Sequence, residues 1–439
     1  MRSFVIGCLS VGLVSFAVAG SVQAQENNTP PKGFTALYNG KDLSGWHGEE
    51  TMDPRNWKKM SDEDRTKKLA ADAANAKMHW RVDSNGDLVN DGQGAYLTTD
   101  KPYGDIELFI DWKIVAKGDS GVYLRATPQV QIWDPSDPDQ LRNNADKGSG
   151  GLWNNTPGRP GKDPLVVADN KIGEWNRFHI VQLGDRTTIH LNGKLIVDGA
   201  SLENYWDRKQ PLFPTGPIQL QTHGREIRWR NLFIREIPAD EANAKLRGKD
   251  PEGFVAVFNG KDLTGWAGAV DNYQVEEGAI MCKPGKGGAL HTKDEYADFI
   301  ARVEFQLPPA GNNGLAIRYP GQGDPAYAGM CELQVLDTEH ENYKGLDPRQ
   351  AHGSAYGMAA SHRGYLRPTG QWNYQQVTVQ GSAIKVELNG VTILETDLSK
   401  ITEYMANSPH PGKDLKKGFF GFAGHGDPVK FRNVSIKKL

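Results

Sequence analysis

The chain has 439 residues, which allows two to four domains of ordinary size, and its charges almost cancel, with 51 Lys and Arg against 54 Asp and Glu. Without a basic excess to neutralise phosphates, nucleic acid is not expected as a partner. Apolar residues make up 38%, and 50 glycines with 25 prolines indicate a turn-rich fold of short strands rather than a helical bundle.

The first 24 residues have the pattern of an export signal. Arg2 gives a positive start, residues 5–19 form an apolar run, and a small residue, Ala24, ends the segment. The run is too short to span a membrane, and no later stretch reaches the required ~20 apolar residues. We therefore predict cleavage near Ala24, a periplasmic or secreted protein, and no membrane span. Cys282 and Cys331 then remain, either as a disulfide or as two buried thiols.

An internal repeat is the strongest signal in the sequence. Residues 33–48 return as residues 253–268, with 11 of 16 positions identical. Later landmarks follow in the same order: 118–125 with 311–318, 129–134 with 332–337, 173–176 with 370–373, 191–193 with 388–390, 223–224 with 425–426, and 230–231 with 432–433. Because the period is roughly 200 residues, we predict a duplicated domain rather than a solenoid. The expected organisation is a signal peptide at 1–24, a first domain at 33–237, a polar linker at 238–252 and a second domain at 253–439.

Each half reads mostly as β-strand. Residues 106–114, 178–183 and 188–191 alternate apolar and polar side chains, as half-buried strands do. Gly184-Asp185 and Asn192-Gly193 are hairpin signals between such strands. Many short strands separated by turns predict an all-β, antiparallel sandwich in each half.

One segment of the first half has no counterpart in the second. Residues 53–78 are rich in Lys, Asp and Ala, and Ser61 followed by Asp64 resembles a helix-capping box. We predict a short helical insertion that begins near Ser61. It is either a solvated surface helix or a lid over a site.

Strand parity marks one face of each half as the candidate binding face. Val130 and Ile132 point to one side of their strand, so the polar neighbours point to the other. Amide and aromatic side chains suit a sugar, because the ring stacks on an aromatic group and the hydroxyls bind amides. The side chains that we expect to bind substrate are Gln129, Gln131, Trp133, Gln221 and Gln334.

Five recurring motifs resemble a known family. They are Phe-Asn-Gly-Lys-Asp-Leu-Thr-Gly-Trp at 258–266, Ser-Gly-Val-Tyr-Leu-Arg at 120–125, the strands at 129–134 and 332–337, Gly-Glu-Trp-Asn at 173–176, and the terminal His-Gly and Arg-Asn pairs at 223–224 and 230–231, repeated at 425–426 and 432–433. Together they resemble the 3-keto-disaccharide hydrolase family, long known as DUF1080 and also called the 3-keto-glucoside lyase/hydratase domain. The resemblance covers nearly all of the chain after the signal, twice. It implies two tandem concanavalin A/laminarinase-like antiparallel β-sandwiches of the jelly-roll type, whose concave sheet holds the ligand, and action on glycosides already oxidised at C3.

A ketone at C3 makes the C2 proton acidic. A positioned base can then remove that proton while the C1 substituent departs, and water adds to the resulting 2-hydroxy-3-keto-glucal. We predict that His223 or His425 serves as the base or the acid, because an imidazole titrates near neutrality.

The remaining catalytic candidates are carboxylates and arginines. Asp134, or Glu332 together with Asp337, is expected to be the other proton carrier, although an Asp that ends a strand is often only a turn former. Arg125 or Arg318 is expected to stabilise the enolate oxygen, or else to be structural. A divalent metal ion is compatible with this chemistry, but no tight ligand motif is visible.

Two further readings remain. Glu332 and Asp337 resemble the acid pair of retaining glycosidases, but the first half has Gln129 in place of Glu332, so two-carboxylate hydrolysis is disfavoured. A non-catalytic carbohydrate-binding protein with two lectin-like sandwiches is the alternative from another functional class. The sequence gives neither the oligomeric state nor which half is active.

Overall fold

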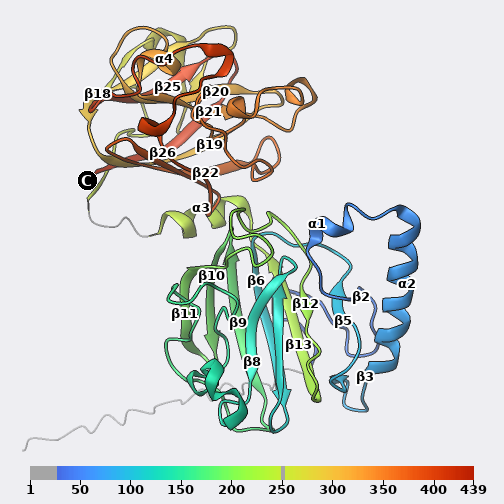
Figure 1. The fold of residues 1–439 in the computed structure, drawn as a ribbon. Helices are drawn as coiled ribbons and strands as arrows, with labels where there is room; N and C mark the ends of the chain where they lie inside the picture. The colour runs from blue at the N-terminus through green and yellow to red at the C-terminus, as the bar shows by residue number, and fades with distance from the viewer. Residues whose placement is uncertain (1–26, 249–252) are drawn as a thin grey trace, which may run out of the picture.

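The computed structural model describes residues 27–248 and 253–439, and it consists of two β-sandwiches that follow one another along the chain (Figure 1). The expected signal peptide lies outside the described residues. Within them, no helix is both long and apolar enough to cross a membrane. All strand pairs of the four sheets are antiparallel, so the predicted all-β tandem is confirmed.

The N-terminal sandwich packs an eight-stranded sheet against a five-stranded one. The larger sheet has the order β11-β10-β9-β6-β13-β4-β3, with β1 beside β13, and the smaller has the order β2-β5-β12-β7-β8. The strands of the larger sheet are β1 Thr35–Ala36, β3 Trp80–Val82, β4 Leu88–Asn90, β6 Ile106–Ile114, β9 Asn176–Leu183, β10 Arg186–Leu191, β11 Lys194–Ser201 and β13 Ile227–Glu236. Those of the smaller sheet are β2 Trp46–Glu49, β5 Tyr96–Thr99, β7 Asp119–Leu124, β8 Thr127–Trp133 and β12 Gln219–Leu220.

The C-terminal sandwich repeats this plan. Its larger sheet has the order β16-β17-β26-β19-β22-β23-β24, with β14 beside β26, and its smaller sheet has the order β15-β18-β25-β20-β21. The larger sheet comprises β14 Phe254–Ala256, β16 Tyr273–Glu276, β17 Ala279–Cys282, β19 Phe299–Gln306, β22 Trp372–Gln380, β23 Ala383–Leu388, β24 Val391–Asp397 and β26 Lys430–Lys438. The smaller comprises β15 Trp266–Gly268, β18 Gly288–Tyr296, β20 Asn312–Tyr319, β21 Cys331–Leu336 and β25 Gly418–Gly424.

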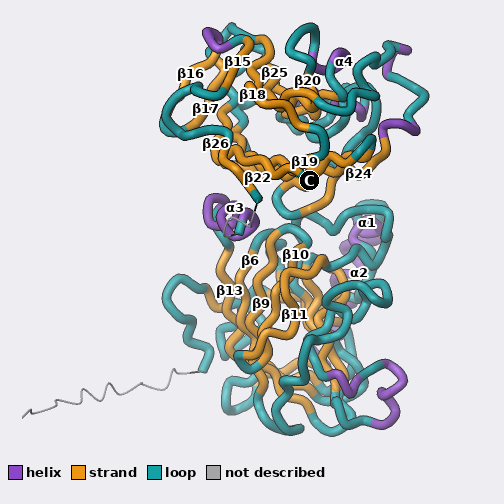
Figure 2. The backbone as a smooth tube through the Cα atoms, turned by 90° about the vertical axis from the view of Figure 1, so that its left-hand side faces the viewer, coloured by secondary structure: helices purple, strands orange, loops and turns teal. Residues whose placement is uncertain are grey.

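Helices are few and mostly short (Figure 2). They are α1 Pro54–Trp57, α2 Asp62–His79, α3 Ala239–Arg247 and α4 Pro325–Ala328, with 3-10 turns at Pro138–Asn143, Ala145–Lys147, Val270–Asn272, Glu341–Tyr343, Pro348–Gln350, Leu398–Lys400 and Met405–Asn407. The predicted insertion is α2, and the Ser61 side chain caps it by accepting a hydrogen bond from the Asp64 amide.

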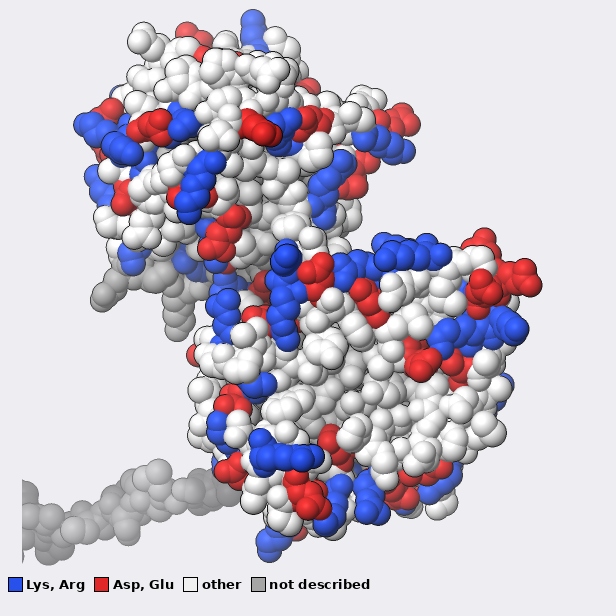
Figure 3. Space-filling view, in the orientation of Figure 1, with Lys and Arg blue, Asp and Glu red and all other residues white. Residues whose placement is uncertain are grey.

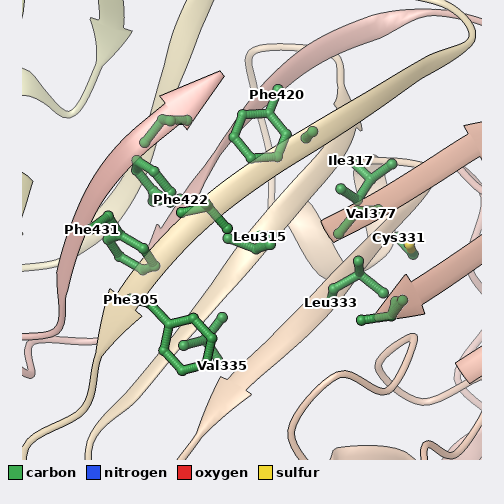
Figure 4. Packing of buried hydrophobic residues seen from close by; sticks show 14 of the residues in the cluster. Phe305, Leu315, Ile317, Cys331, Leu333, Val335, Val377, Phe420, Phe422 and Phe431 are labelled. Carbon is green, nitrogen blue, oxygen red and sulfur yellow. The ribbon is translucent and has the colours of Figure 1, made fainter. Parts of the chain in front are cut away.

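The inward-facing apolar residues of each sandwich form its core. Val130, Ile132, Leu333 and Val335 are all buried, as strand parity predicted. Figure 4 shows the C-terminal core, where Leu333 and Val335 of β21 belong to the same buried cluster as Phe305, Phe422 and Phe431. Cys331 and Cys282 are both buried and free, which selects two thiols over a disulfide.

The hairpins follow the predicted turn chemistry. Asn192 and Gly193 have φ values of 51° and 80°, and Asn389 and Gly390 have 51° and 81°. Two successive positive φ values are the requirement of the tight turn that matches strand twist, and Asn-Gly meets it with little strain.

The two sandwiches dock head to tail. The hairpin turn at 184–185 of the first contacts the turn at 389–390 of the second, where the Asp185 amide donates to the Gly390 carbonyl at 3.2 Å. Helix α3, which occupies much of the expected linker, lies between the sandwiches in both views (Figures 1 and 2). Arg247 of α3 donates to Glu304 on β19 at 2.6 Å.

A half-buried aspartate anchors this junction. Asp105 accepts the Gly184 amide at 2.8 Å and pairs with Arg125 at 3.2 Å, both within the first sandwich. Arg367 of the second sandwich reaches the other oxygen of Asp105 at 3.2 Å. The second half repeats the internal part, since Asp298 accepts the Gly381 amide at 2.9 Å and pairs with Arg318 at 2.8 Å. Asn170 occupies the position in the first half that Arg367 has in the second.

Candidate functional site

A pocket of about 440 Å³ opens on the outer face of the five-stranded sheet of the first sandwich. Its wall includes all four substrate-binding candidates of the first half and one catalytic candidate: Gln129, Gln131, Trp133, Gln221 and His223. The strand register brings them together, because β8 pairs with β7 and β12 pairs with β7 on its other side. Figure 3 shows Lys and Arg mixed with Asp and Glu over the visible surface, without a large field of one sign.

His223 and Asp119 form the titratable pair of this pocket. His223 Nδ1 lies 3.3 Å from Asp119 Oδ2, and the second Asp119 oxygen accepts a hydrogen bond from Gln131 Nε2 at 2.8 Å. Burial raises the pKa of the Asp119 carboxyl, and the nearby His223 opposes that rise. Because the carboxylate faces Nδ1, the other ring nitrogen of His223 is left for a ligand.

Aromatic side chains form the walls. Trp133 and Trp153 meet edge to face with their ring centroids 5.2 Å apart, and Lys162 Nζ lies 4.2 Å from the Trp153 ring centroid. Tyr205 and Trp206 make a second edge-to-face pair at 5.2 Å on a different loop. Such rings offer flat apolar surfaces of the kind that pack against the C–H face of a pyranose.

Amide side chains supply the polar contacts of the wall. Gln221 donates to the Tyr96 hydroxyl at 3.1 Å, while its own Oε1 is buried without a hydrogen-bond partner among the described residues. Gln140, Asn143 and Asn154 add further amides from the loops. A buried acceptor without a partner is costly, so the orphaned Gln221 oxygen indicates a place where a ligand hydroxyl or a water binds.

The second sandwich carries a related cluster on the corresponding face. Glu332 Oε1 lies 3.7 Å from His425 Nε2, an ion pair without a direct hydrogen bond. Gln334 Nε2 donates to Asn312 Oδ1 at 2.6 Å, and Gln334 Oε1 is buried with no partner among the described residues. Burial raises the pKa of Glu332, and the neighbouring Glu332 carboxylate in turn raises the pKa of His425.

The two clusters differ in which strand supplies the acid. Asp119 of β7 corresponds to Asn312 of β20, whereas Gln129 of β8 corresponds to Glu332 of β21. The glutamine that donates to this side chain occupies equivalent positions in the two halves. Gln131 donates to Asp119, and Gln334 donates to Asn312. Each half therefore has one acid, two amides and one histidine. The acid and one of the amides have exchanged strands between the two halves.

The arginine candidates lie away from both clusters. Arg125 and Arg318 have φ values of 53° and 46°, and this left-handed backbone ends the alternation of the strand, which turns the side chain from the polar face. Arg125 donates to the Phe213 carbonyl and pairs with Asp105. Arg318 donates to the Ala297, Gly381 and Leu415 carbonyls and pairs with Asp298. Their observed contacts are structural, in contrast to the expected place beside the enolate.

The strand-ending aspartates are turn formers. Asp134 accepts the amides of Lys117 and Ser136, each at 2.9 Å, and Asp337 accepts the Ala310 amide at 2.9 Å. These bonds occupy the carboxylates in the loops next to the strands. The structure thus does not bring Asp337 into a pair with Glu332 of the kind that two-carboxylate glycoside hydrolysis requires.

Helix α2 lies beside the pocket without lining it. Gly48 of β2 packs so closely on α2 that a Cβ there would lie 2.6 Å from the Ala76 Cβ. The helix covers the edge of the small sheet and, apart from Ala76, is not buried, which favours the surface-helix interpretation over the lid. No group of three His, Cys, Asp or Glu side chains converges on a possible metal position in the part of the chain that is described.

The sequence interpretation missed Asp119, Tyr123, Trp153, Tyr205 and Trp206. A signal existed for Asp119, because the repeat aligns Gly118-Asp119 with Gly311-Asn312 and strand parity places Asp119 on the face of Trp133. No periodic pattern marks Trp153, Tyr205 or Trp206, since they lie on irregular loops.

Comparison with known proteins identifies the family. A 3-keto-disaccharide hydrolase of Bacteroides thetaiotaomicron is 25% identical over 248 residues, which cover 47% of this chain and 86% of that protein. A structure from Parabacteroides distasonis, named as a candidate glycosyl hydrolase, is 28% identical with a TM-score of 0.37 and covers 43% of this chain and 94% of its own. A carbohydrate-binding module of Bacillus subtilis is 12% identical, with a TM-score of 0.29 and coverages of 40% and 96%. The model of the 3-keto-alpha-glucoside-1,2-lyase-like domain matches residues 33–235 and again residues 253–437, so the chain belongs to that family in two tandem copies.

Proposed function

We propose that this protein is an exported enzyme that cleaves 3-keto-glycosides by β-elimination and hydration, a net hydrolysis. The single observation that carries the proposal is the Asp119–His223 pair at an aromatic-walled pocket. Membership of the family and the name of the Bacteroides relative support the substrate class. The export signal expected in residues 1–24 supports the compartment.

The reaction needs a base near C2 and a proton donor near the glycosidic oxygen. The base takes the C2 proton, the electron pair forms the C1=C2 bond, and the C1–O bond breaks as the aglycone leaves with a proton. Water then adds its oxygen to C1 and a proton to C2, which gives free 3-keto-glucose. No oxidant or reductant is consumed, because the ketone is already present in the substrate.

We assign the base role to His223. Asp119 faces Nδ1 and stabilises the imidazolium that forms, so Nε2 is the nitrogen that accepts the C2 proton. The same nitrogen can return this proton to the departing oxygen. The amides of Gln140, Asn143 and Asn154 supply donors for the sugar oxygens, including the enolate at C3.

The test is turnover of 3-keto-sucrose or 3-keto-trehalose, with and without divalent ions, followed by release of the free sugar. Wild-type protein should cleave the keto sugar and leave the parent disaccharide intact. Asp119→Asn and His223→Ala should each lower kcat/KM by roughly 100-fold or more. His190→Ala, on β10 of the opposite sheet, is the matched control and should keep wild-type turnover.

The contrary result is equally clear. Saturable binding of unmodified glycans, with no release of 3-keto-glucose under any metal condition, would replace the enzyme by a carbohydrate-binding protein. Full turnover by both pocket variants would show that the pair is not the reaction centre.

A further inference from the structure

We infer that the two halves divide the reaction, so that the first-half site performs the elimination and the second-half site adds water to the enone that elimination leaves. This inference rests on the proposed function, because the enone exists only if cleavage proceeds by elimination. The second site is the cluster of Glu332, Gln334, Asn312 and His425.

The two steps make different demands on a site. Elimination takes a substrate of at least two rings or a ring and an aglycone, and it needs a base that starts without a proton. Hydration takes a single small ring, and it needs one group to deprotonate water and another to protonate C2. One fixed arrangement serves both steps less well than two.

The imidazole is held by opposite nitrogens in the two halves. In the first, Asp119 faces Nδ1 of His223, and in the second, Glu332 faces Nε2 of His425. The acid stands on β7 in the first half and on β21, the counterpart of β8, in the second. The glutamine beside it occupies equivalent positions in the two halves, Gln131 and Gln334. The ring nitrogen that remains for a ligand therefore differs between the two sites.

Three strand positions of the second face carry smaller side chains than their counterparts in the first half. Ala316 stands where the first half has Tyr123, and Gly421 and Ala423 stand where it has Gln219 and Gln221. Large walls that stack on a second sugar ring are thus absent from these β20 and β25 positions. These positions leave room for a ring with its C1=C2 edge toward Glu332.

Glu332 is placed as a reactive group rather than as a structural one. Its side chain is 4% exposed, and in the described part of the chain its carboxylate accepts no hydrogen bond, with only the ion pair to His425 beside it. It lies directly over Gly314, where a Cβ would come within 2.2 Å of Oε1, so only glycine leaves this space. A buried carboxylate with so few partners is costly to stability, and a water or ligand hydroxyl would satisfy it.

These groups account for the hydration step. The Glu332 carboxylate takes a proton from the water whose oxygen bonds to C1, and the His425 imidazolium gives a proton to C2. Proton transfer from Glu332 to His425 then restores both groups, across the 3.7 Å gap or through one water. Atoms and charges balance, and the product is 3-keto-glucose.

The experiment follows three species over time in the full chain: the 3-keto-disaccharide, the enone by its ultraviolet absorbance, and 3-keto-glucose. Glu332→Gln and His425→Ala should each consume the disaccharide at a near wild-type rate while the enone accumulates at least 10-fold above wild type. The double variant that combines Asp119→Asn with His223→Ala should leave the disaccharide intact and still hydrate enone that is supplied to it. Glu395→Gln, an acid on β24, is the matched control with wild-type behaviour.

The outcomes separate this inference from the proposed function. If wild type cleaves the disaccharide but neither second-half variant slows hydration beyond the uncatalysed rate, the division of labour is wrong while the function stands. If the first-half double variant loses hydration of supplied enone as well, one site performs both steps. If wild type releases no sugar from the keto substrate, the proposed function itself fails. Thermal unfolding of each variant checks that the loss is not one of folding.

Discussion

The polar faces of the two sandwiches share a histidine and a glutamine but differ in where the acid stands. Asp119 comes from β7 in the first, and Glu332 comes from β21 in the second. The adjacent strands of the sheet thus offer two positions from which a carboxylate can reach the same imidazole. The comparison teaches that duplication preserved the scaffold around the histidine and changed the nitrogen by which it is held.

The largest expected effect comes from giving the first half the acid pattern of the second. Asp119→Asn together with Gln129→Glu should keep the Gln131 contact, because Gln334 makes the same contact to Asn312. The acid would then face the imidazole from the other strand, and we expect cleavage of the keto-disaccharide to fall by roughly 100-fold or more. Gln129→Glu alone keeps Asp119 but loses the hydrogen bond that Gln129 donates to Gln131, so it measures that loss separately. An unchanged kcat/KM in the double variant would mean that the strand of origin is immaterial.

The aromatic wall provides the next test of the comparison. Trp153→Ala removes a stacking surface worth about 1.5–3 kcal/mol, so KM for the disaccharide should rise roughly 10- to 100-fold. Trp175→Ala is the control, because Trp175 directly precedes β9 of the opposite sheet. Its ring centroid lies 4.1 Å from the Arg230 guanidinium carbon. Equal KM changes in the two variants would contradict the assignment of the pocket.

The duplicated arginines should affect stability rather than turnover. Arg318→Met leaves three backbone carbonyls and Asp298 without their donor, and we expect a loss of about 3 kcal/mol in the free energy of unfolding. Arg125→Met should cost less, because Arg125 Nε already lacks a partner among the described residues. Urea unfolding measures both, and a large loss of kcat/KM in a folded variant would restore the catalytic assignment.

A smaller, pH-dependent effect is expected in the second half. The pKa of His425 is raised chiefly by Glu332, with Asp324 and Asp427 adding to the negative field. A raised histidine pKa stabilises the fold below the unfolded value of about 6.5, and this contribution is lost as the pH rises through the folded pKa. Above the folded pKa of His425, the buried Glu332 side chain lacks its cationic partner.

The melting temperature of wild type should therefore fall by a few degrees as the pH rises from 6.5, while that of Glu332→Gln should change less. Scanning calorimetry at a series of pH values gives the comparison. A steeper fall in Glu332→Gln than in wild type would reverse the sign and contradict the coupling.

The smallest effect concerns the junction. Arg367→Asn copies the residue at the equivalent position 170 and removes the cation that joins Asp105 to the second half. We expect a loss of about 1 kcal/mol and faster proteolysis between the halves. Arg367 also donates to Asn243 Oδ1 of α3 and to the Trp372 carbonyl, while the contact between the turns at 184–185 and 389–390 remains. Limited proteolysis with wild type and Asn170→Ala as references measures it, and identical cleavage rates would show that the bond is dispensable.

The fold could be predicted because the relevant signals are local. Alternation over 106–114 and Asn-Gly at 192–193 specify a strand and a turn with little reference to the rest of the chain. Because the sequence repeats, each prediction of a strand or turn in one half applied to the other half as well. The polar face followed from the same parity, which placed Gln129, Gln131 and His223 together.

The rest of the site could not be read in this way. Arg125 turns from the face because a non-glycine residue adopts a left-handed conformation, which alternation does not reveal. Trp153 and Trp206 reach the pocket on loops whose paths depend on tertiary packing. Asp119 was visible only as an Asp aligned with an Asn, and its proximity to His223 depends on the register of β7 and on the chain after β12.

The head-to-tail junction has a consequence for contacts between molecules. A contact between unlike surfaces of equivalent units can repeat without end and build a filament. Here the second half presents Asp298, the counterpart of Asp105, to its surroundings. The first half of another molecule offers Asn170 at the position of the Arg367 cation. An end-to-end contact between two molecules would therefore lack the ion pair that Arg367 and Asp105 make within the chain.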